Sequence, residues 1–160
     1  MTEADIGSRT RIGVNRAALR FRCDWWVFAD WQTFIEYAGS LGVVPACFTT
    51  RDSLASLARR GLRPPAVVFE DIVADLPPCW RVFSASAALA LAASLGTVDV
   101  AVFGADMAGA LDYDGTTGGR NRRDADRWCR EREIMASMVS AARRIGIEVT
   151  GLNGTFPKPN

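Results

Sequence analysis

The sequence contains no histidine, and this absence excludes several kinds of catalytic and metal site. Neither a Ser-His-Asp nor a Cys-His arrangement can form, so a general base has to be Asp, Glu, Tyr, Cys or the single lysine, Lys158. The cysteines stand far apart with no C-x-x-C pair, and no histidine completes a zinc set, which predicts free thiols that are mostly buried. They are Cys23, Cys47, Cys79 and Cys129.

Long hydrophobic runs and a strong charge imbalance are also missing. The longest apolar run, residues 85–95, is too short to span a membrane and contains Ser86 and Ser94, and the first residues lack the apolar core of a signal peptide. We therefore expect a cytoplasmic protein without membrane contact. The net charge of +1 predicts no general attraction to nucleic acid, and packing in the core explains the five tryptophans more simply.

What the chain does have is enough apolar content for one sizeable core. With 160 residues and 49% hydrophobic content, it predicts a single domain over residues 1–160, with loosely held ends at 1–10 and 153–160. Several short apolar runs are uniformly apolar, as in strands buried on both faces, and helical patterns separate many of them. The fold class expected is α/β, with a mostly parallel central sheet covered on both sides. The expected strands are 12–14, 25–29, 43–48, 66–69, 81–83, 98–103 and 147–152.

Four helices are expected, at residues 30–41, 50–60, 85–95 and 124–145. Asp30, Thr50 and Ser84 are suitable amino-terminal caps for the first three. The last helix places apolar side chains on one stripe and charged side chains, Glu131 among them, elsewhere, so one face should pack on the sheet. That stripe contains Trp128, Met135, Met138, Ala142 and Ile145, and Gly146 should end the helix.

Polar side chains that follow strands are the first candidates for ligand contacts. Asn15 follows strand 12–14 and would hydrogen-bond a base, a sugar or a phosphate, with helix capping as an equal alternative. Asp30 follows strand 25–29 with the same two alternatives, of which capping is favoured. At Ser84 and Ser86, free N–H groups at a helix start would attract an anion, although an ordinary capped helix explains the same residues.

The segment after strand 98–103 is the principal candidate for chemistry. Ligands of open α/β sheets collect outside the carboxyl ends of the strands, so Gly104 and Asp106 should lie at the site, with Asp106 as the catalytic group. A long loop follows, of the kind that often carries function. It contains Asp112, Tyr113, Asp114, Arg120, Arg122 and Arg123.

The charged residues of this loop allow two readings. The arginines would clamp phosphate, or would pair with Asp124 and Asp126. Asp112 and Asp114 would hold a divalent cation together with a nucleotide, but they make a poor metal motif alone, so no metal site and no firm cofactor are predicted.

Two stretches resemble a known group of proteins. IGVNRAALRFRCDWWVFADWQTF and FSASAALALAASLGTVDVAVFGADM resemble the Rossmann-like superfamily of bacterial sialyltransferases, archaeal hydroxymethylpterin diphosphokinase-like proteins and related uncharacterised phage proteins. Asn15, Ser84, Leu95-Gly96 and Gly104-x-Asp106 match its motifs over about residues 11 to 152. The resemblance implies a three-layer Rossmann-like domain that binds nucleotides or nucleotide sugars.

Three departures from that pattern bear on catalysis. The family's glycine-rich phosphate loop would precede Ile12, where eleven residues are too few for it. Ala85 stands where the family has glycine, which keeps a ligand further from the backbone. The chain lacks the sialyltransferases' histidine base, and Ala108 lies where they have tyrosine, so sialyl transfer by their mechanism is not expected.

The sequence thus predicts a nucleotide- or nucleotide-sugar-binding protein of phage or bacterial origin. If it is an enzyme, it should resemble a glycosyl- or diphospho-transferase. The alternative is a non-catalytic binding or assembly protein, which would partner further copies of itself and has lost the phosphate loop and the base.

Overall fold

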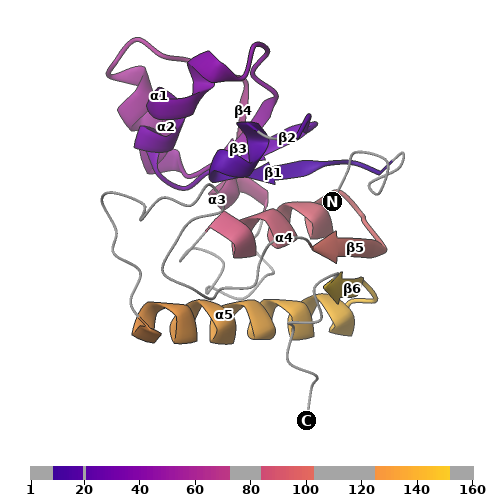
Figure 1. Ribbon diagram of the computed structural model, residues 1–160. Helices are drawn as coiled ribbons and strands as arrows, with labels where there is room; N and C mark the ends of the chain where they lie inside the picture. The colour runs from indigo at the N-terminus through magenta and orange to yellow at the C-terminus, as the bar shows by residue number, and fades with distance from the viewer. Residues whose placement is uncertain (1–8, 20, 73–83, 103–124, 152–160) are drawn as a thin grey trace.

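The computed structural model describes residues 9–19, 21–72, 84–102 and 125–151 (Figure 1). Four strands form one sheet in sequence order, and two more form a second sheet. Every strand pair in both sheets is parallel, so the predicted α/β class is confirmed. The strands are β1 (Ile12–Val14), β2 (Trp25–Val27), β3 (Ala46–Thr49) and β4 (Ala66–Val68) in the first sheet, and β5 (Asp99–Val102) and β6 (Glu148–Gly151) in the second.

Side chains of the four-stranded sheet alternate between two apolar clusters, one on each face. Val27 and Phe48 lie in the cluster that also contains residues of the carboxyl-terminal half. Trp26 and Cys47 lie in the other cluster, which is confined to the first 66 residues. Since neighbouring residues of one strand face opposite sides, both faces of the sheet are buried, as the uniformly apolar strand sequences predict.

Helices cover both faces (Figure 1). On the face of Trp26 lie η2 (Asn15–Leu19), α1 (Trp31–Tyr37), η3 (Ala38–Ser40) and α2 (Arg51–Ala58). On the face of Val27 lie α3 (Phe69–Ile72) and α4 (Ser84–Ser94), with α5 (Ala125–Arg144) packed against α4. The four predicted helices are therefore present: α1 and α2 are shorter than predicted, and α4 is shifted by one residue to begin at Ser84.

Several predicted strand ends differ from the structure by one to three residues, and two of these differences have a clear physical cause. The chain enters β3 at Ala46 instead of Val43, because Val43 is 84% exposed and Pro45 has no N–H to donate to a ladder. Phe69 begins the short helix α3 instead of ending β4, and its ring packs on Phe48 with centroids 4.1 Å apart. Packing of this ring into the core thus overrides the strand preference of an aromatic residue. The predicted strand 81–83 lies outside the described residues.

The long helix α5 follows its predicted stripe only in part. Met135, Met138 and Ala142 are buried as expected, but Ile145 is 61% exposed because it follows the last helical turn. Glu131, assigned to the polar face, is buried. Gly146 ends the helix as predicted, with a positive φ of 86° that glycine adopts without strain. The side chain of Trp128 lies outside the described part.

The two sheets meet near their amino ends. The Arg9 guanidinium forms an ion pair with the Asp99 carboxylate at 2.7 Å, which places the start of β5 beside the chain that leads into β1. No ladder joins β1 to β5 within the described residues. Among the described helices, none is long and apolar enough to cross a membrane.

The described cysteines are free, as predicted, but most of them are not buried. Cys47 is buried, Cys23 is half-buried and Cys129 is exposed. Cys129 is exposed because it lies on α5 away from the buried stripe that contains Met135 and Met138. Cys79 lies outside the described residues.

Candidate functional site at the carboxyl edge of the sheet

Parallel pairing brings the carboxyl ends of β1, β2 and β3 to one edge of the sheet. Val14 pairs with Val27, and Val27 pairs with Phe48, so the residues that follow these three positions leave the sheet together. Asn15 follows β1 directly, and Asp30 lies three residues past Val27. The structure therefore places two of the predicted ligand residues on neighbouring strands of the same edge.

Asn15 has an unusual backbone. Its φ is +48°, and it is the non-glycine residue with positive φ among the described ones. Its carbonyl accepts a hydrogen bond from the indole N–H of Trp26 at 2.9 Å, which fixes the turn. Its side-chain amide has no hydrogen-bond partner within the described part of the chain. No described contact therefore supports the alternative that the Asn15 side chain caps a helix. Asparagine tolerates this left-handed conformation better than other side chains, which explains the residue type.

Asp30 occupies the cap position of α1 without capping it. Its carboxylate makes no hydrogen bond to the first turn of α1, and the residue is exposed. The prediction that the Asp30 side chain mainly caps the helix is therefore wrong: the residue stands at the cap position, but its carboxylate forms no cap bond. The backbone carbonyl of Asp30 accepts a bond from the N–H of Thr33 at 3.1 Å, so the turn closes through the main chain, and the carboxylate extends into solvent.

Thr50 caps α2 as predicted. Its hydroxyl accepts a hydrogen bond from the N–H of Ser53 at 3.2 Å and lies 3.3 Å from the carbonyl of Ala29. The Ser53 hydroxyl also donates to that carbonyl. Glu70 accepts from the N–H of Arg51 at 3.1 Å, so the start of α2 is already occupied by a carboxylate of the chain.

The start of α4 points to the same edge. Its last residues lead into β5, whose Asp99 pairs with Arg9 at the amino edge. The helix has 11 residues and is about 16 Å long, which exceeds the length of a three-residue strand, so its first residue reaches the carboxyl edge. Contact between α3, which follows β4, and α4 agrees with this direction (Figure 1).

Ser84 and Ser86 are buried at this helix start. Ser84 is the first helical residue instead of the expected cap, and it is 7% exposed. Its hydroxyl has no hydrogen bond within the described residues, whereas Ser86 is hydrogen-bonded or otherwise engaged. A serine hydroxyl at the positive end of a helix is suited to an anion's oxygen.

One polar group at this edge was not singled out from the sequence. Thr49, the last residue of β3, is fully buried, and its hydroxyl has no hydrogen-bond partner among the described residues. Its sequence context, a threonine at a strand end before the cap Thr50, gives no sign of this.

The remaining predicted site residues lie outside the described part of the chain. They are Gly104, Asp106, Asp112, Tyr113, Arg120 and Arg122. Their assignments stay predictions. Within the described ranges, no group of three or more His, Cys, Asp or Glu side chains is arranged to hold a metal ion.

The thiols of Cys23, just before β2, and Cys47, in β3, are poor nucleophiles. Burial raises the pKa of Cys47 to about 12, and the neighbouring Cys23 adds to the shift. Burial also raises the pKa of Cys23, although a hydrogen bond from the Gly13 backbone opposes this. Both thiols are therefore protonated at neutral pH and contribute little to covalent catalysis.

Comparison with known proteins gives no relatives: no family model matches the chain, and neither a curated protein nor a solved structure matches it.

Proposed function

We propose that the chain binds a nucleotide or nucleotide sugar at the carboxyl edge of a three-layer Rossmann-like domain. The position of Asn15 carries this proposal. An amide held in a left-handed turn, at the end of a parallel strand and without a partner in the described chain, is preorganised to bond a ligand. In open α/β sheets, that edge is where ligands collect.

The order of the elements supports the location. The helices that follow β2 and β3 lie on one face of the four-stranded sheet, whereas α4 and α5 lie on the other. The change of face falls between β1 and β5, whose starts are linked through Arg9 and Asp99. A change of this kind opens a crevice at the carboxyl ends of doubly wound sheets, and Asn15 lies at the end of β1.

The roles follow from the chemistry of each group. The N–H groups at the start of α4 and the Ser84 hydroxyl suit a phosphate. The Asn15 amide suits a base or sugar, and the exposed Asp30 carboxylate suits sugar hydroxyls. In an enzyme, Asp106 would orient the acceptor, and Gly104, Asp112, Tyr113, Arg120 and Arg122 would complete the site. A divalent cation would accompany the nucleotide.

A thermal-shift and calorimetry screen with CMP, CDP, UDP, ATP and sugar-nucleotide donors tests the proposal. At a ligand concentration of 100 times Kd, one site stabilises the protein by about 2.7 kcal/mol. Asn15→Gly keeps the left-handed turn without strain and removes only the amide, so it should lower affinity without lowering stability. Gln32→Ala, at an exposed position of α1, is the matched control. Equal affinity of Asn15→Gly and Gln32→Ala would contradict the assignment.

The same experiment separates enzyme from binding protein. Product formation from a bound donor supports a transferase. Binding without turnover supports a non-catalytic binding protein. Absence of any shift, together with a stable oligomer in light scattering, supports the assembly alternative.

A further inference from the structure

A cationic surface lies at the carboxyl end of α2, separate from the edge described above. Arg59, Arg60 and Arg63 are exposed within five residues of sequence. None of the three forms an ion pair with a described carboxylate, although Arg51, at the other end of α2, pairs with Asp71. Three like charges thus stand together with no counter-charge in the described chain. Either an external anion or the negative end of the helix would offset them.

The helix accounts for part of the arrangement. The Arg60 guanidinium donates to the carbonyl of Ser56 at 2.8 Å, and Arg59 donates to the Ser56 hydroxyl at 3.0 Å. Cations at a helix end also offset the negative end of the dipole. These contacts use one of the five N–H groups of each guanidinium, so capping leaves most of their donors unused.

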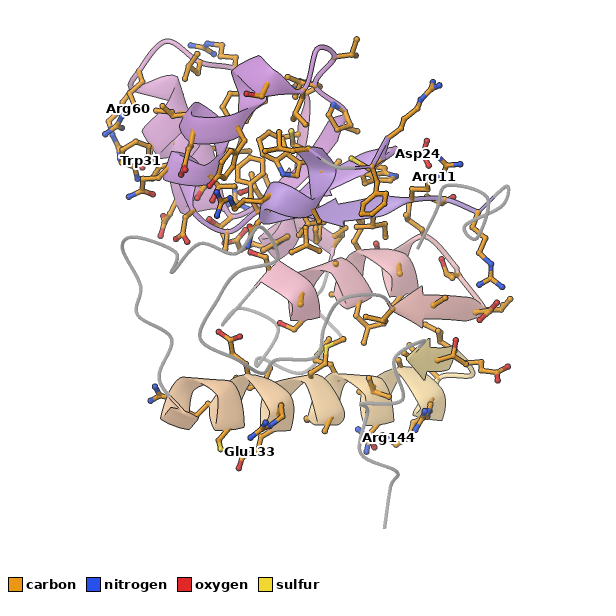
Figure 2. All side chains as sticks on the ribbon, in the orientation of Figure 1. Arg11, Asp24, Trp31, Arg60, Glu133 and Arg144 are labelled. Carbon is orange, nitrogen blue, oxygen red and sulfur yellow. The ribbon has the colours of Figure 1, made fainter. Side chains whose placement is uncertain are left out.

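Trp31 fixes the orientation of Arg60. The Arg60 guanidinium carbon lies 3.6 Å from the centre of the Trp31 ring, and Figure 2 shows the two side chains together at the outer side of α1 and α2. Trp31 is itself packed against the apolar cluster of Trp26 and Leu57, which holds the indole in place. The stack and the bond to Ser56 together restrict the guanidinium plane, so little side-chain entropy is left to lose on binding an anion.

The negative end of the α2 dipole does not prevent an anion from binding to Arg60. The last carbonyls of α2 already accept bonds from the N–H groups of Arg59, Arg60, Gly61 and Leu62. Their partial charges are therefore partly compensated. Four N–H groups of Arg60 have no acceptor within the described residues, and a planar fork of this kind matches the oxygens of a phosphate.

We propose that Arg60, oriented by Trp31 and assisted by Arg59 and Arg63, binds linked phosphate groups at this surface. A single phosphate engages the Arg60 fork, and the neighbouring arginines contact the adjacent phosphates. Linked phosphates occur in free oligophosphates and in the backbone of single-stranded nucleic acid. This surface does not depend on the nucleotide site proposed above.

Calorimetry of the full chain with tripolyphosphate at low salt tests the proposal. Arg60→Gln should weaken binding about tenfold or more, because the fork is lost with the charge. Arg60→Lys keeps the charge and should still lose about threefold or more. Arg130→Gln, at an exposed position of α5, removes the same charge elsewhere and should stay within about twofold of the parent. Trp31→Leu should weaken binding while Arg60 is retained, and circular dichroism confirms its fold.

Two ligands distinguish the source of the phosphates. An oligothymidine of about ten nucleotides that binds through Arg60 and is displaced by tripolyphosphate identifies a nucleic-acid backbone. Binding of tripolyphosphate alone identifies a free oligophosphate. The proposal is overturned if Arg60→Gln and Arg130→Gln bind tripolyphosphate equally well, or if neither phosphate ligand binds the parent chain.

Discussion

The indole N–H of Trp26 donates a hydrogen bond to the backbone carbonyl of Asn15 over 2.9 Å, and this bond joins the centre of the core to the candidate ligand edge. Trp26 is fully buried and stacks on Phe34 with ring centroids 5.6 Å apart. The strained turn at Asn15 is thus anchored by a side chain that cannot move without disturbing the core.

Trp26→Phe should therefore affect both stability and the turn. The smaller ring leaves a void and removes the indole donor to the Asn15 carbonyl, which should cost about 2 kcal/mol in urea unfolding. Ligand affinity should fall as well, because the Asn15 backbone loses its anchor. Phe28→Leu, in the same apolar cluster but without this bond, is the control. A loss of affinity as large in Phe28→Leu would show that only packing matters.

Gly13 is required in β1 because its neighbours leave no room for a side chain. A Cβ at this position would lie 3.0 Å from Ala18 and from the Cys23 sulfur. Gly13→Ala should lower the free energy of unfolding by about 1 to 3 kcal/mol, since η2 would have to move away from β1. Gly39→Ala is the control, because a Cβ there meets no atom within 4 Å. Its stability should be unchanged or slightly raised, as measured by thermal unfolding.

The sequence alone predicted the parallel strands because their apolar runs are uninterrupted, as at Trp25 to Val27. It did not predict the helix at Phe69, because packing of that ring on Phe48 is a tertiary effect. For the site, Asn15 could be selected as a polar residue after a strand. The hydrogen bond that its carbonyl accepts from Trp26 could not be predicted, since Trp26 comes from the next strand. The stack of Arg60 on Trp31 joins the turn after α2 to the start of α1 and has no local sequence signal.

The two cap positions at this edge should respond differently to alanine. Thr50→Ala should lower the free energy of unfolding by about 1 kcal/mol, because it removes the acceptor for the Ser53 N–H. Asp30→Ala should leave stability within about 0.5 kcal/mol of the parent, because its carboxylate forms no cap bond. Paired urea titrations of the two variants measure the difference. Equal losses would mean that Asp30 caps α1 in solution.

Thr49 presents a buried hydroxyl without a hydrogen-bond partner in the described chain. Thr49→Val replaces it with a methyl group of similar shape and should raise the free energy of unfolding by about 1 kcal/mol, because the desolvation cost of the hydroxyl disappears. Thr49→Ser keeps the hydroxyl, removes the methyl group, and should be destabilised. Stabilities come from urea unfolding. A loss of stability in Thr49→Val would instead show that the hydroxyl is satisfied in solution.

Cys47 should make the protein sensitive to alkaline pH. Its pKa is raised to about 12 in the folded chain, so the unfolded chain ionises first as the pH rises, near the ordinary thiol value of about 9. The stability attributable to the neutral thiol is complete below pH 9 and is lost progressively up to about pH 12. Cys47→Ala should flatten this part of the curve of unfolding free energy against pH, at some cost in packing. Cys129→Ser, at an exposed position, should leave the curve unchanged, and a curve equally flattened by both substitutions would contradict the assignment to Cys47.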